Sequence, residues 1–91
     1  MSMSPPPTNF QWIGNTLSYT LDPSVTGLQI KYRKAGEINW TTIYDDFNSA
    51  PSSCPLSSTN GPTGEVMGLT SKTSEDKWGP PGVEEITNQN V

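Results

Sequence analysis

Residues 27–43 read GLQIKYRKAGEINWTTI, and this stretch decides the fold class of the chain. Large apolar or aromatic residues occupy every second position of 28–32, which is the period of a strand with one buried face. Ala35-Gly36 predicts a turn, and residues 38–44 are rich in the β-branched and aromatic residues that favour strands. We therefore expect two adjacent antiparallel strands joined by a charged turn.

Three further segments have the character of strands. Residues 16–23, TLSYTLDP, alternate large and polar side chains and form the cleanest pattern of a half-buried strand in the chain. Residues 9–14, NFQWIG, suit a shorter strand that ends at a Gly-Asn turn. Residues 65–70, EVMGLT, favour one more strand. Before residue 45 the apolar period is two rather than 3.6, so we expect an all-β fold.

The chain divides into three regions. Residues 1–8, MSMSPPPT, form a proline-rich arm, because consecutive prolines favour an extended polyproline conformation. Residues 9–73 contain the predicted strands and a long loop at 48–64 that is rich in Ser, Pro and Gly. Residues 74–91 are polar and rich in turn residues, and we expect them to form an extended C-terminal tail. The sequence predicts one small domain with two arms.

Composition excludes several classes of partner. The chain has nine acidic and five basic residues and a net charge of −4, so it lacks the cations that nucleic-acid binding needs. No run of about 18 apolar residues is present, and we expect no membrane partner. The N-terminus does not have the pattern of a signal peptide, which favours synthesis in the cytoplasm without secretion.

The residue inventory also argues against catalysis. Histidine, the commonest general base and metal ligand, is absent, so a Ser-His-Asp or Cys-His arrangement cannot form. A single cysteine cannot build a structural zinc site. The acidic pairs Asp45-Asp46 and Glu84-Glu85 would place their carboxylates on opposite faces of a strand and are expected to be solvated. We predict no enzymatic activity, no catalytic residues, no metal, no cofactor and no small-molecule substrate.

The strand pattern resembles the fibronectin type III family, a β-sandwich of seven strands. The motif LQIKYR at 28–33, followed by Gly36 and Trp40, is similar to the third strand, turn and tryptophan of that family. The similarity covers about residues 5–73. Glu75 stands where the family has the tyrosine of its corner motif, and no convincing strand follows it.

The resemblance implies a small, incomplete fibronectin type III or immunoglobulin-like antiparallel sandwich with extended N- and C-terminal arms. We expect the first five strands, with the last two lost or replaced, and Trp40 buried at a core position of the family. Unpaired strand edges and uncovered apolar surface would need neighbouring molecules to cover them. We therefore expect the two arms to lie along adjacent subunits.

The candidate interface residues are aromatic, basic, sulfhydryl and aliphatic side chains outside the clearest core pattern: Phe10, Trp12, Lys31, Arg33, Lys34, Cys54, Trp78, Val83 and Ile86. Aromatic residues in such contexts anchor protein interfaces or stack on sugars. The basic cluster is either the solvent face of a strand or a patch for an acidic partner. Cys54 is either an inert loop thiol or half of an intermolecular disulfide.

Modules of this family are common on the surfaces and tails of bacteriophage particles. The resemblance therefore implies a non-enzymatic structural subunit of a virion, made in the host cytoplasm, with capsid decoration as the first role and a neck or tail accessory protein as the second. Its partners would be other virion proteins and copies of itself. The alternative is a carbohydrate-binding or adhesion module of a larger secreted system, which would use Trp12 or Trp78.

Overall fold

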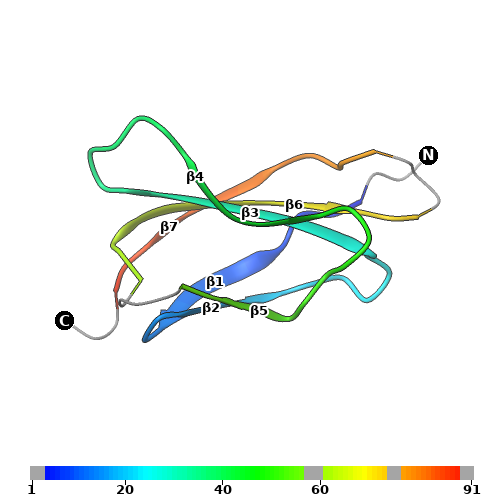
Figure 1. The fold of residues 1–91 in the computed structure, drawn as a ribbon, viewed down its shortest axis with the longest axis horizontal. Coiled ribbons are helices and arrows are strands. Elements are labelled where there is room, and N and C mark those ends of the chain that lie inside the picture. The colour runs from blue at the N-terminus through cyan, green and yellow to red at the C-terminus, as the bar shows by residue number, and fades with distance from the viewer. Residues whose placement is uncertain (1–3, 57–60, 74–76, 89–91) are drawn as a thin grey trace.

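The structure is a computed structural model that describes residues 4–56, 61–73 and 77–88. These residues form seven β-strands and no helix (Figure 1). The strands are β1 (Thr8–Ile13), β2 (Thr16–Thr20), β3 (Gly27–Lys34), β4 (Thr41–Asp46), β5 (Ser53–Pro55), β6 (Gly64–Ser71) and β7 (Gly82–Ile86). They build two antiparallel sheets, one in the order β1-β2-β5 and the other in the order β4-β3-β6-β7.

The predicted all-β antiparallel sandwich is confirmed, but its predicted strand count is wrong. Two strands lie where the sequence predicts none: β5 inside the loop 48–64 and β7 inside the segment 74–91. The first is only three residues long, and the second carries adjacent glutamates that break the alternation of apolar and polar residues. The last two strands of the sandwich are therefore present, because β6 and β7 close the four-stranded sheet.

Some predicted features lie outside the described residues. These are residues 1–3 of the arm, residues 57–60 of the loop, residues 74–76 with Glu75, and residues 89–91 of the tail.

The hydrophobic core lies between the two sheets, and both sheets contribute to it. Its buried members are Phe10, Trp12, Leu17, Leu28, Ile30, Cys54, Val66 and Ile86. Their strands follow the alternation that the sequence predicts: on β3, the inward Leu28 and Ile30 flank the outward Gln29. Full burial of a large apolar side chain stabilises a fold by about 1.5–3 kcal/mol, so this small set supplies most of the cohesion between the sheets.

The described part of the N-terminal arm packs on its own chain. Ser4 and Pro7 are buried, and the hydroxyl oxygens of Ser4 and Thr70 lie 2.6 Å apart in a hydrogen bond. The Thr70 hydroxyl also donates a hydrogen bond of 2.6 Å to the carbonyl oxygen of Pro5. Residues 4–7 of the arm, which we expected to lie along an adjacent subunit, thus pack on their own chain.

Glycines make room for the arm. A Cβ on Gly68 would lie 2.5 Å from the ring of Pro7, and a Cβ on Gly79 would clash with the carbonyl oxygen of Ser4. Close approach of one backbone to another is a common reason for glycine in a sheet. The arm thus fills a groove that β6 and the segment before β7 form with these glycines.

The C-terminal segment ties the two sheets together. The Glu84 carboxylate on β7 accepts hydrogen bonds from the backbone N–H groups of Asn9, at 3.1 Å, and Phe10, at 3.0 Å, on β1. Asn9 has a φ of 58°, and the β1–β2 register shifts at this point. Glu84, which the sequence suggests is solvated, is therefore a link between β7 and β1.

Candidate protein interface

Four of the nine predicted interface residues lie in the core. Phe10, Trp12, Cys54 and Ile86 have exposed fractions of 7%, 0%, 3% and 6%. The two sheets face each other over these side chains, which are therefore covered within the chain itself. Of the remaining five, Lys34 and Val83 are exposed, whereas Lys31, Arg33 and Trp78 are partly buried.

The structure reverses the expected roles of two tryptophans. Trp12 is fully buried and meets Tyr32 edge to face, with ring centroids 6.2 Å apart. Trp40 is only partly buried and is not a core residue. Tyr32 pairs with Thr41, so Trp40 falls beside Arg33 on the opposite face of the sheet. The Trp12 ring is therefore not accessible for stacking on a sugar.

Trp78 also packs inside its own chain. Its ring lies 5.1 Å from that of Phe47 at an interplanar angle of 82°, and its backbone bridges to Ser71. The sequence offers no strand for Trp78 to pack on, because this contact joins segments about thirty residues apart. The side chain therefore helps to close the far end of the sandwich.

Cys54 sits in a protected environment. Its Sγ atom lies 3.2 Å from the Tyr19 hydroxyl, which also donates a 2.7 Å hydrogen bond to the carbonyl oxygen of Pro51. Burial raises the pKa of the Cys54 thiol, and burial together with the thiol contact raises the pKa of Tyr19. Of the two readings left open by the sequence, the geometry favours an inert thiol over an intermolecular disulfide.

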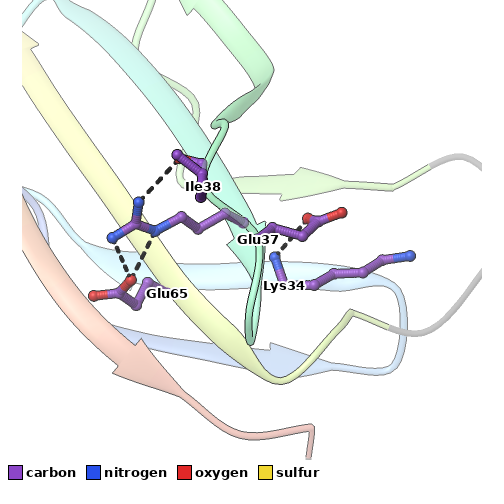
Figure 2. A network of polar contacts seen from close by, with 5 residues as sticks. Lys34, Glu37, Ile38 and Glu65 are labelled. Atoms are coloured by element: carbon purple, nitrogen blue, oxygen red, sulfur yellow. Dashed lines mark hydrogen bonds and ion pairs between the residues drawn. The ribbon is translucent and has the colours of Figure 1, made fainter.

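Arg33 organises the turn between β3 and β4. Its Nε and Nη2 atoms each lie 2.7 Å from Oε1 of Glu65, and Nη1 donates a 3.1 Å hydrogen bond to the carbonyl oxygen of Ile38 (Figure 2). Its guanidinium carbon lies 4.3 Å from the centroid of the Trp40 ring. This planar group therefore fastens the turn to β6 and is not a free cation for an acidic partner.

The turn itself is closed by reciprocal hydrogen bonds. The Glu37 N–H donates to the carbonyl oxygen of Lys34, and the Lys34 N–H donates to the Glu37 carboxylate, both at 2.9 Å (Figure 2). Gly36 has a φ of 88°, in the left-handed region that glycine adopts without strain. Beyond it, Ile38 is 83% exposed. The molecule therefore presents a large apolar side chain on an ordered turn.

Two hollows flank this turn. One, of about 300 Å³, has Ala35, Thr63, Glu65 and Glu85 in its wall, and the other, of about 380 Å³, is lined by residues 36–39 and Thr41. Ile13, the last residue of β1, is also 63% exposed. We call residues 34–40 the docking turn, because an exposed apolar side chain and surface hollows coincide around it.

The sequence alone does not single out Ile38 or Glu65. An isoleucine directly after a polar Gly-Glu turn is a local signal of an exposed apolar side chain, because turn positions favour small and polar residues. Glu65 has no such signal, because its role depends on pairing with Arg33 across β3 and β6.

No other kind of site stands out. Within residues 4–56, 61–73 and 77–88, no group of three or more side chains is placed to hold a metal ion. The same part of the chain contains no helix that could cross a membrane. Comparisons with family models, with curated proteins and with solved structures find no match to this chain.

Proposed function

We propose that the chain is a non-enzymatic structural subunit that docks on another protein of a larger assembly through the docking turn. The observation that carries this proposal is Ile38, which is 83% exposed on a turn that Arg33 and Glu37 hold in place. An apolar side chain on an ordered backbone suits insertion into a partner's pocket, because little conformational entropy is lost on binding.

The chemistry of the chain supports a binding role. It contains no histidine, and its one cysteine is buried with a raised thiol pKa. Two of the described carboxylates serve structural contacts: Glu65 pairs with Arg33, and Glu84 holds β1. General acid-base catalysis most often uses histidine, which this chain lacks.

The edges of the four-stranded sheet favour docking by side chains rather than by strand addition. Edge strand β4 ends in Asp45-Asp46, and edge strand β7 follows Pro80-Pro81 and carries two glutamates. Charges and prolines on edge strands are the usual protection against pairing with another chain. The proposal therefore rests on the exposed turn and not on unpaired strand edges, because the last two strands of the sandwich are present.

The assembly that we propose is a bacteriophage particle, with capsid decoration as the first role and a neck or tail accessory protein as the second. The support for this choice is the resemblance of residues 28–40 to fibronectin type III modules, together with the all-β, two-sheet architecture.

Gradient sedimentation of the assemblies from the source cells tests this proposal. We expect the wild-type chain to sediment with a large assembly and Ile38→Asp to remain at the top, because a charge cannot enter an apolar pocket without a partner. Ile38→Leu is the matched control and should sediment like the wild type. A wild-type chain that stays at the top of the gradient would contradict the proposal.

A further inference from the structure

Residues 61–63 tie together two turns of the sandwich. The Gly61 N–H donates a 2.9 Å hydrogen bond to the carbonyl oxygen of Gly14, in the turn between β1 and β2. The Ala35 N–H, in the docking turn, donates a 3.0 Å hydrogen bond to the carbonyl oxygen of Thr63. The pairing of β3 with β6 ends one residue before Ala35, so this bond extends the attachment of β3 into the docking turn. We call residues 61–63 the clasp.

Asn88, which follows the end of β7, holds both ends of the clasp. Its side-chain amide donates a hydrogen bond to the carbonyl oxygen of Gly61, and its backbone N–H donates a 3.0 Å hydrogen bond to the Thr63 hydroxyl. The bonded residues are 27 and 25 positions apart, so the strands alone do not impose these contacts. The clasp and the segment after β7 are therefore ordered together.

The clasp also covers Trp12, the largest fully buried side chain. A Cβ on Gly61 would overlap the indole ring of Trp12, so the Gly61 backbone lies directly on that ring. The buried Nε1–H group of Trp12 has no hydrogen-bond partner among the described residues. A buried donor without a partner is unfavourable, and contact with water would satisfy it. The contacts of the clasp thus keep Trp12 covered although its indole N–H would be better solvated.

Few contacts hold the clasp in place. The hollow of about 300 Å³ borders it, with Ala35, Thr63 and Thr87 in the wall. The hydrogen bond from the Asn88 N–H to Thr63 is exposed. Segments with exposed hydrogen bonds and little apolar packing open at a lower free-energy cost than core strands do. The clasp therefore has the features of a segment that opens while both sheets stay folded.

We propose that the clasp opens and closes as one unit, and that Asn88 sets this equilibrium and so couples the C-terminal segment to the docking turn. In the closed state Asn88 holds Gly61 over Trp12. Through the same clasp, Thr63 holds Ala35 in the docking turn. Opening releases Ala35 and lets water reach Trp12 in one step. Asn88 is thus a positioning residue that acts on the docking turn through the clasp.

Hydrogen exchange in the isolated full chain, followed by NMR, tests the clasp. We expect Asn88→Ala to speed the exchange of the Ala35 amide and of the Trp12 indole N–H at least about fivefold, the scale of one lost hydrogen bond. Thr63→Val keeps the shape of the side chain but removes the hydroxyl that accepts from Asn88, so it should act in the same direction. Thr87→Ala, at the exposed neighbouring position, is the matched control and should exchange like the wild type.

Two reference amides separate opening of the clasp from a change in global stability. Val25, in the turn between β2 and β3, should keep its wild-type exchange rate in every variant. Ile30, which pairs with a strand on each side, should exchange more slowly in the wild type than Ala35 and the Trp12 indole. Unchanged rates at Ala35 and Trp12 in the Asn88 variant would overturn the proposal. A Trp12 indole as slow as Ile30 in the wild type would do the same.

Exchange in the docked chain tests the link to the docking turn, which rests on the proposed function. A partner bound to the docking turn favours the closed clasp, because binding and ordering of one segment are thermodynamically linked. Mass spectrometry of the chain recovered with the large assembly should show exchange at Ala35 at least about tenfold slower than in the free chain. Equal rates would overturn this link. A wild-type chain that does not enter the assembly would overturn the proposed function, whereas the rates in the isolated chain would still decide the clasp.

Discussion

At the scale of the residue, burial determines what each polar or reactive side chain does. As a basic side chain, Arg33 could bind an acidic partner. In the structure, however, its guanidinium group contacts Glu65, the Ile38 carbonyl group and the Trp40 ring. Its planar fork satisfies several acceptors at once, which a lysine at this position could not do. Lys31 and Lys34 have no such role and keep their charges at the surface. One basic cluster thus contains one structural residue and two surface residues.

The Cys54 thiol gives a prediction at the same scale. Because Cys54 is buried and its pKa is raised, we expect a neutral thiol reagent to modify the folded protein at least about 100-fold more slowly than the urea-unfolded protein.

The folded state also binds the thiol proton of Cys54 more tightly, so the free energy of unfolding should fall as the pH rises above about 8.5, the unfolded thiol pKa. Reagent labelling followed by mass spectrometry measures the first effect, and urea unfolding at increasing pH measures the second. Rapid, complete labelling of the folded chain would contradict this account.

At the scale of the element, β7 shows how a polar strand joins a sandwich. It forms the backbone hydrogen bonds of an antiparallel pair with β6, and its Ile86 side chain reaches the core. On its inner face, Glu84 replaces an apolar side chain and crosses to the backbone of β1. A carboxylate that accepts two N–H groups forms charge-assisted hydrogen bonds, which are stronger than neutral ones. This link holds two edge strands of different sheets together.

Replacement of Glu84 tests that link. We expect Glu84→Ala to lower the free energy of unfolding by about 1–3 kcal/mol, because the partly buried N–H group of Phe10 and the exposed N–H group of Asn9 lose their acceptor. Glu84→Gln keeps one acceptor oxygen and should cost less. Urea unfolding in dilute protein measures the change. Glu85→Ala, on the exposed side of the same strand, is the control and should stay within about 0.5 kcal/mol. Equal losses for the two alanine variants would contradict the role of Glu84.

At the scale of the whole molecule, the N-terminal arm completes the sandwich. Ser4 and Pro7 are buried against β6 and the segment before β7, about seventy residues further along the chain. Prolines lose little conformational entropy when they dock, because their φ angle is already restricted. The described part of the arm therefore contributes to the stability of its own chain.

Gly79→Ala tests the docking of the arm. The new Cβ would clash with the Ser4 carbonyl oxygen, so either the arm or the backbone must move, at a cost of about 1–3 kcal/mol. Thermal unfolding measures this cost as a lower Tm. In a chain without residues 1–7 the same substitution should have little effect, because the clashing atom is gone. An equal loss of stability in both backgrounds would show that Gly79 acts on something other than the arm.

The sequence by itself determined the strands with a clear alternation, β1, β2, β3, β4 and β6, and therefore the all-β class. Alternation is a local property, because successive side chains of a strand point to opposite faces. Only the tertiary structure decided what depends on distant partners. It formed β5 against β2 and β7 against β6, and it placed Trp12 rather than Trp40 in the core. These outcomes follow from pairing and burial between segments far apart in the chain, and no local pattern of residues encodes them.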